Sequence, residues 1–276
     1  MAADKQRSIA DEPETTDASD TSGGPEMPFL GHLEELRWRI VWMVLGIVAG
    51  AIACGIAIDW LINEVLLLPI VAVNHNLQPG QQPIHLQNLK PFGQVFLYMQ
   101  VALVGGVILS LPNVFWQLWR FISPGLLPKE RRYISWIVFF STFCFLAGVA
   151  FAYFVMLPAA LTFFAGFGTS EIENNIAINE YMSFVISMIL GAGIVFELPM
   201  VSWFLSKLGI LTPAFMRHYR RHAIVVILFL AAILTPGTDP VSQILLAIPL
   251  LLLYELSIGI SAIAWKQKKS AEEENT

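Results

Sequence analysis

Three carboxylates stand in surroundings that are otherwise basic. Glu34 and Glu35 precede a pair of arginines, and Glu130 lies between Lys129 and Arg131. An ionised carboxylate accepts hydrogen bonds, and the planar fork of a guanidinium suits it especially well. These acids could therefore bind a cationic ligand that the surrounding bases would repel. Local roles stay open: Glu130 can pair with its neighbours, and Glu34 and Glu35 can complement the dipole of a helix that begins here.

A fourth acid, Glu197, lies inside a long apolar run that also contains Pro199. Within a bilayer, a carboxylate costs about 2.5–3.5 kcal/mol on the insertion scale and needs a partner or a wet cavity. Pro199 cannot donate an N–H to the carbonyl of Val195, so we expect a kink. Glu197 is thus a candidate intramembrane polar site, and a structural bond to a neighbouring helix is the alternative. Glu255, in the last apolar run, is expected to be structural.

The sequence offers no basis for catalysis, a metal or a cofactor. It contains no GxxxxGK[ST], HExxH, GxSxG or CxxC pattern. His218 and His222 are four residues apart but belong to a basic stretch, which favours a solvated helix face. Cys54 and Cys144 each lie inside an apolar run, where they fit as small apolar side chains better than as a disulfide or metal pair.

The composition places these residues in a membrane protein. Apolar residues make up 56% of the 276 residues and charged residues only 13%, and the mean hydropathy is +0.64. Soluble domains usually carry about 25% charged residues. A bilayer core takes about 20 helical residues, and its backbone groups must bond to one another. We therefore predict an all-α integral membrane protein with about six transmembrane helices, near 39–59, 95–119, 134–157, 181–205, 222–235 and 241–264.

The basic residues give the orientation. Fifteen of the 16 Lys and Arg fall before the first predicted helix, between the second and third, between the fourth and fifth, or after the sixth, and Lys90 is the exception. By the positive-inside rule both termini are cytoplasmic. The uncharged core of the fifth helix, 223–234, would be only about 18 Å long. We therefore expect the last two helices to be short and the bundle to be curved rather than compact.

Three regions are expected along the chain. Residues 1–26 hold seven acids and two bases with few large apolar residues, so they should form a disordered acidic tail. Residues 27–265 form the six-helix membrane domain, and residues 266–276 form a charged C-terminal tail. This first segment lacks the apolar h-region of a signal peptide, and its acidity argues against an organellar transit peptide, so we expect it to be neither.

Five motifs together resemble the TatC family, the multi-spanning receptor component of the twin-arginine protein translocase. They occur in order along most of the chain: residues 32–37 (His-Leu-Glu-Glu-Leu-Arg), 121–132 (Phe-Ile-Ser-Pro-Gly-Leu-Leu-Pro-Lys-Glu-Arg-Arg), 151–154 with Pro158, 196–199 (Phe-Glu-Leu-Pro), and 235–239 with Ser242 and Gln243. Each is weak alone, but five in register are specific. The acidic tail is not part of the resemblance.

The resemblance implies a receptor for signal peptides that carry two consecutive arginines. Such a protein helps move folded cargo across a bacterial or archaeal cytoplasmic membrane, powered by the proton-motive force. It works with single-span partners of the TatA and TatB kind, as a homo-oligomer within a larger complex, and without nucleic acid or a cofactor. The implied residues for twin-arginine binding are Glu35, Glu130, Phe121 and Arg37. Register with the family favours Glu35 over Glu34.

Two further sites are expected within the membrane. Glu197 should face a polar groove and bond a substrate or partner group. Thr235 and Gln243 should dock a polar residue of a single-span partner helix, since polar side chains at this depth can hydrogen-bond across helices. The alternative for Thr235 and Gln243 is bonding to water or to the intervening turn.

Two other functions remain open at this point. The first is a proton-coupled small-solute transporter that uses Glu197, which predicts a polar cavity at mid-membrane and some repeat symmetry. The second is an assembly scaffold that never contacts substrate, in which the acids of the basic segments would have no function.

Overall fold

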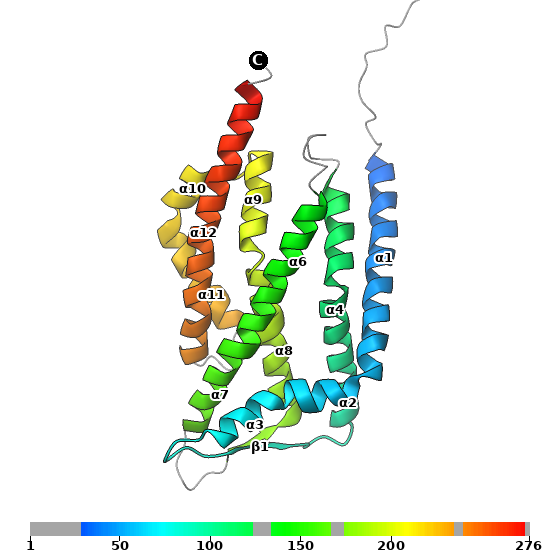
Figure 1. The fold of residues 1–276 in the computed structure, drawn as a ribbon, viewed down its shortest axis with the longest axis vertical. Coiled ribbons are helices and arrows are strands. Elements are labelled where there is room, and N and C mark those ends of the chain that lie inside the picture. The colour runs from blue at the N-terminus through cyan, green and yellow to red at the C-terminus, as the bar shows by residue number, and fades with distance from the viewer. Residues whose placement is uncertain (1–28, 124–133, 167–173, 235–239, 274–276) are drawn as a thin grey trace, which may run out of the picture.

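The computed structural model describes residues 29–123, 134–166, 174–234 and 240–273, most of which are helical. The upright helices in Figure 1 are α1 (Phe29–Ile56), α4 (Gly93–Ile122), α6 (Ile134–Phe151), α8 (Ile178–Val195), α9 (Leu198–Leu208), α11 (Arg220–Leu234) and α12 (Pro240–Glu273). The π-helix η3 (Ala152–Met156) and α7 (Leu157–Gly166) continue α6, and the short α10 (Pro213–His218) precedes α11. The acidic tail 1–26 lies outside the described residues.

Six described segments are long and apolar enough to cross a membrane, which confirms the predicted all-α membrane class. They are Leu33–Ile56, Ile58–His75, Gly93–Ile122, Ile134–Gly166, Ile178–Leu208 and Gln243–Gln267. Five of them contain or overlap the predicted helices. Large apolar side chains on their outer surfaces remain exposed, among them Leu45, Val48 and Ile52 of α1. Lipid rather than water is the medium that such a surface suits.

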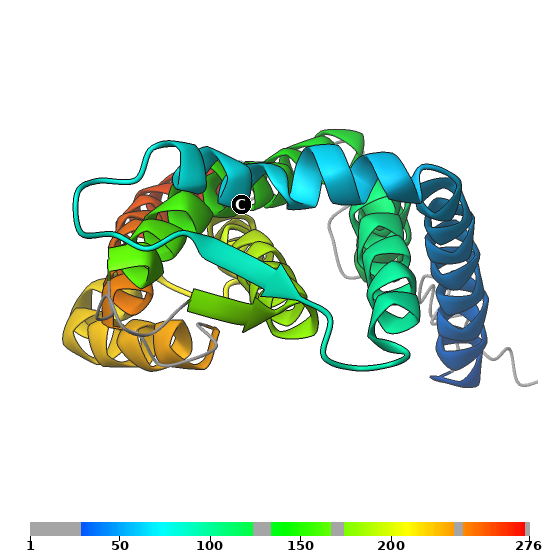
Figure 2. The same cartoon turned by 90° about the horizontal axis from the view of Figure 1, so that it is seen from below.

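The sixth candidate is not the predicted fifth helix. The prediction 222–235 corresponds to α11, which has only 15 residues. The segment Ile58–His75 consists of α2 (Ile58–Trp60), the π-helix η1 (Leu61–Leu66) and α3 (Leu68–His75), and it runs across the ends of the upright helices (Figures 1 and 2). Predicting no helix between residues 59 and 95 was wrong, and Asp59, Glu64 and Pro69 interrupt the apolar run enough to hide the helix. The expectation of a short last helix was also wrong, because α12 has 34 residues.

The helices pack as an open row rather than as a closed ring. Helix α1 packs on α4, α4 on α6, and α6 on α8. Helices α9 and α11 both pack on α12. Glycines let α1 and α4 approach closely, since a Cβ on Gly106 would lie 2.4 Å from the backbone nitrogen of Ala51. Asn113 of α4 donates a hydrogen bond of 3.0 Å to the carbonyl of Trp42 on α1. Small residues at such contacts are typical of membrane helices.

The crossing segment is fastened by buried tyrosines and a short sheet. The hydroxyls of Tyr153 and Tyr181 donate bonds of 2.7 Å to the carbonyls of Val65 and Leu66. These bonds satisfy carbonyls at the end of η1 that helix geometry leaves without a donor. Below them, strands β1 (Ile84–Gln87) and β2 (Asn174–Ala177) pair in parallel, with Ile84 opposite Asn174.

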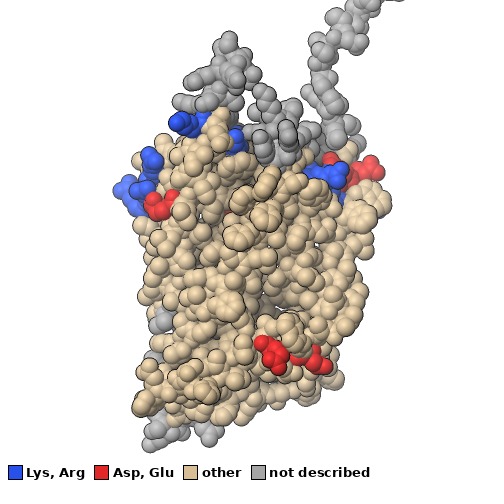
Figure 3. Space-filling model, viewed as in Figure 1, with Lys and Arg blue, Asp and Glu red and all other residues tan. Residues whose placement is uncertain are grey.

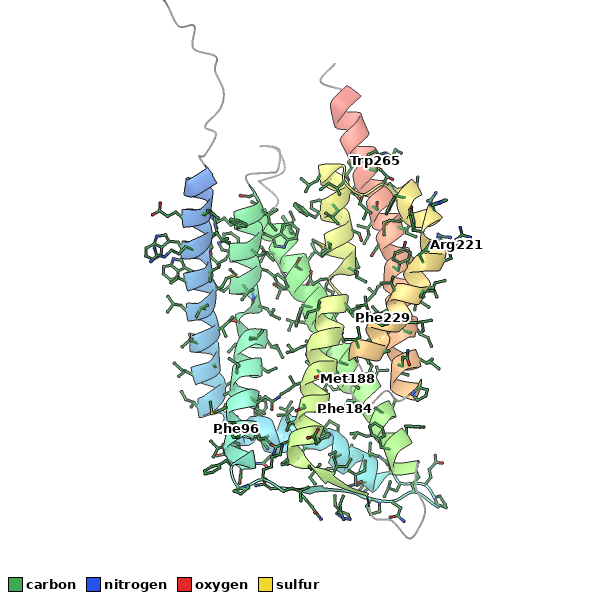
Figure 4. The ribbon with its side chains drawn as sticks, turned by 180° about the vertical axis from the view of Figure 1, so that it is seen from behind. Phe96, Phe184, Met188, Arg221, Phe229 and Trp265 are labelled. Carbon is green, nitrogen blue, oxygen red and sulfur yellow. The ribbon has the colours of Figure 1, made fainter. Side chains whose placement is uncertain are left out.

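The charges divide the molecule into two ends. Helix α1 begins and α12 finishes at the same end (Figure 1), which we call the basic end. On the face shown in Figure 3, all visible Lys and Arg lie at this end. Figure 4 shows Arg221 and Trp265 near it and Phe96 towards the opposite end. The bases at the basic end whose side chains the structure describes are Arg37, Arg39, Arg120, Lys207, Arg217, Arg220, Arg221 and Lys266. That the basic end faces the cytoplasm stays a prediction.

Candidate functional site

Glu35 lies on the first turns of α1, at the basic end, and is paired with Arg39. Arg39 Nε donates a hydrogen bond of 3.0 Å to Glu35 Oε1, and Arg39 Nη2 contacts the same oxygen. The exposed fractions of the side chains are 26% for Glu35 and 13% for Arg39. Glu35 Oε2 is buried and has no hydrogen-bond partner among the residues that the structure describes. One oxygen of this carboxylate is therefore satisfied and the other is not.

The packing of α1 on α4 brings Glu35 level with Phe121. The bond between Asn113 and the carbonyl of Trp42 fixes the antiparallel register of the two helices. About two turns towards the basic end from this bond lie Glu35 on α1 and Arg120 on α4, and Phe121 follows directly. Phe121 is half-buried. The predicted neighbours Glu35 and Phe121 thus share one level at the basic end.

The structure says less about the positions of the other residues predicted for this site. Arg37 and Glu34 are exposed on α1. Glu130 lies outside the described residues, in the segment 124–133 that follows Ser123. The structure therefore neither brings Glu130 to Glu35 nor separates the two. Sequence reasoning missed Arg39, although its spacing of four residues from Glu35 on a helix was a readable sign of pairing.

Glu197 lies at the break between α8 and α9, as the proline pattern predicts. Helix α8 ends at Val195 and α9 begins at Leu198, with Pro199 in its first turn. The Glu197 carboxylate lies near the Ser141 hydroxyl and the backbone of Phe145, both on α6. Its Oε1 atom is buried and has no hydrogen-bond partner in the described part of the chain.

The Ser141 hydroxyl beside this acid belongs to a buried pair of polar side chains. Trp119 of α4 donates a bond of 3.2 Å from Nε1 to Ser141 Oγ, and Ser141 is fully buried. Gly148 permits the close approach of α6 to α8, since a Cβ there would lie 2.6 Å from the carbonyl oxygen of Ala192. Glu197 therefore has a polar neighbour on another helix, the arrangement expected of the structural alternative. The predicted groove and ligand contact remain hypotheses.

Gln243 is engaged within the chain. Its Nε2 donates a hydrogen bond of 3.1 Å to the carbonyl of Leu228, which joins α12 to α11. This partner is neither water nor the 236–239 turn, the two alternatives that the sequence suggested. Thr235 lies outside the described residues.

Glu255, the other acid in an apolar run, has a structural partner. Glu255 of α12 accepts a bond of 2.8 Å from Arg220 of α11, in agreement with the structural role expected of it. Cys54 and Cys144 are free thiols on α1 and α6. Among the described residues, no group of His, Cys, Asp and Glu is arranged to hold a metal ion.

An apolar cavity of about 350 Å³ lies between the crossing segment and the upright helices. Its lining comes from η1, α4, α6, η3 and α8, and it includes Leu66, Val101, Val149 and Ile189. This lining offers little to a polar solute. It does not resemble the polar mid-membrane site that a small-solute transporter would need.

The fold and the charges define a class of protein: a polytopic helical membrane protein whose basic end displays an incompletely satisfied carboxylate. Comparisons with known proteins are more specific. A family model described as "Sec-independent protein translocase protein (TatC)" matches residues 31–249. The chain therefore belongs to the TatC family.

Individual relatives agree with the family match. A TatC protein of Desulforapulum autotrophicum is 38% identical over 90% of this chain and 88% of its own length. One of Koribacter versatilis is 36% identical over 90% of each chain. A crystal structure titled as the twin-arginine translocase receptor TatC superposes with a TM-score of 0.71 and 34% identity, over 84% of this chain and 99% of that one.

Family membership settles the broad function. The chain is a multi-span membrane component of the Sec-independent protein translocase, a family not known as enzymes. Its bacterial relatives imply the inner membrane. The reading as a small-solute transporter is not supported.

Proposed function

We propose that this protein is the receptor for twin-arginine signal peptides, and that Glu35 and Glu130 bind the two arginines. The observation that carries the proposal is the state of Glu35: its Oε2 atom is buried without a partner among the described residues. Leaving a charged acceptor in this state costs free energy that a donor from a ligand would recover. An arginine side chain supplies such donors.

The surroundings of Glu35 suit a peptide that carries both charge and apolar surface. Phe121 lies at the same level, at the end of α4. Arg37 is exposed one position past Leu36. We assign to Phe121 the apolar contact beside the arginine pair, and to Arg37 a place at the rim of the site. The segment that carries Glu130 follows from the same end of α4, which allows the two acids to converge.

The partners and the energy source follow from the family. The solved relative is titled a twin-arginine translocase receptor, and we assign the same role here, with folded cargo as substrate and the proton-motive force as energy source. Single-span proteins of the TatA and TatB kind would be its partners in a larger complex that holds several copies of this chain. The bond from Gln243 to Leu228 would set the surface of α11 and α12 that such a helix meets. Both termini would lie in the cytoplasm of a bacterium or archaeon.

Peptide binding tests the proposal. The purified full chain is titrated with a synthetic twin-arginine signal peptide and with a twin-lysine control. Glu35→Gln and Glu130→Gln should each weaken twin-arginine binding by up to about fivefold, the range for partly exposed ion pairs. Glu130→Lys should weaken it further because it adds repulsion. If all three variants keep the wild-type affinity and the wild-type preference for arginine over lysine, the acids do not bind the arginines.

A further inference from the structure

The site assigned to the signal already contains an arginine. Arg39 directs two donors, Nε and Nη2, at the single oxygen Oε1 of Glu35. This geometry differs from a fork that binds both carboxylate oxygens, because Oε2 is left without a partner among the described residues. Arg39 is thus bonded to one of the two oxygens of the carboxylate that the proposed function assigns to the signal peptide.

Arg39 is held more firmly than an ordinary surface arginine. Only 13% of its side chain is exposed, half the exposed fraction of Glu35. It lies about one turn from Trp42, whose carbonyl accepts the bond from α4. Exposed ion pairs are weak because water and salt screen them and because both side chains lose freedom. The Arg39 side chain is already largely ordered and removed from water, so its contact with Glu35 persists in the absence of a ligand.

We propose that Arg39 attenuates signal-peptide binding by competing with the signal arginine for Glu35. This inference rests on the proposed function. A signal arginine can take Oε2, or it can displace Arg39 and bind both oxygens. In either case it meets a carboxylate whose charge is already largely balanced. The competition keeps the affinity low enough for release, since affinity differences among related complexes arise mostly in the dissociation rate.

The test is a double-mutant cycle on Arg39 and Glu35 with the purified full chain and a synthetic twin-arginine signal peptide. Arg39→Gln should tighten binding by about two- to fivefold, the range for such a pair, and slow dissociation by a similar factor. Its affinity should also fall more steeply with salt, because the freed carboxylate carries an unbalanced charge. In the Glu35→Gln background, Arg39→Gln should change nothing, since Arg39 acts only through Glu35.

Two further variants control for folding and for loss of charge. Arg39→Met keeps an apolar stem to pack where the Arg39 stem packs, and it should tighten binding in the same way if Arg39→Gln does not purify as folded protein. Arg220→Gln breaks another ion pair of the basic end, with Glu255, and should leave the affinity unchanged.

The outcomes separate the two proposals. If Glu35→Gln binds the peptide as wild type does, the proposed function fails at this residue, and the inference falls with it. If Glu35→Gln weakens binding but both Arg39 variants bind equally or more weakly than wild type, only the inference is overturned. An effect of Arg39→Gln that persists without Glu35 overturns it too, because Arg39 would then act elsewhere.

Discussion

The contact between α1 and α4 is the part of the fold on which the position of Glu35 depends most directly. A Cβ on Gly106 would lie 2.4 Å from the nitrogen, 2.7 Å from the Cα and 2.9 Å from the Cβ of Ala51. Heavy atoms pack best at about 3.5–4.0 Å, so Gly106→Ala would push α1 away by about 1 Å. Overpacking of this kind costs about 1–3 kcal/mol.

The variant Gly106→Ala should therefore unfold at a lower temperature than wild type in detergent and bind the signal peptide more weakly, because Glu35 moves with α1. Gly55→Ala is the matched control, since a Cβ on Gly55 of α1 would meet nothing within 4 Å. Because Gly55 is helical but lies in the last turn of α1, that change should be neutral or stabilising by less than about 1 kcal/mol. If Gly106→Ala is as stable as Gly55→Ala, the close approach of the two helices does not constrain the residue at position 106.

Three further predictions concern Glu197, Gln243 and orientation. Glu197→Gln should be mild in protein transport, because an amide can still bond the Ser141 hydroxyl, whereas Glu197→Leu should be severe; transport by the Leu variant at the wild-type rate would remove the functional role. A photocrosslinker at Gln243 should trap a single-span partner in membranes. If it traps none, the role left to Gln243 is its hydrogen bond to Leu228, which stabilises the fold by about 0.6 kcal/mol. Cysteines replacing Lys266 and Lys90 should react with impermeant reagents from the cytoplasm and from the opposite side respectively, and the reverse result would invert the topology.

The long helices were predictable because their signal is local. Apolar runs of sufficient length and the sorting of Lys and Arg depend on the bilayer, not on which helices touch. The segment Ile58–His75 was missed because it runs across the others. Its place depends on bonds from Tyr153 and Tyr181, far along the chain, and no periodicity near residue 60 encodes them.

In the candidate sites too, contacts within one helix were predictable and contacts between helices were not. The position of Glu35 at the basic end followed from the charges, and its pairing with Arg39 could have been read from their spacing on one helix. The neighbours of Glu197 could not, because Ser141 and Trp119 come from α6 and α4. Likewise, nothing in the residues around Gln243 indicates that its amide bonds Leu228 of the preceding helix rather than the turn between them.

Helix α4 contacts the surroundings of two of the acids that the sequence singled out, Glu35 and Glu197. Its last turns place Phe121 level with Glu35, while Trp119 bonds the serine beside Glu197. Of the three buried side-chain atoms without a partner in the described residues, two are carboxylate oxygens of these acids, Glu35 Oε2 and Glu197 Oε1. Folding stability gives no reason to keep such atoms, since each one costs free energy. We propose that both oxygens accept donors from another molecule, one at the basic end and one within the membrane.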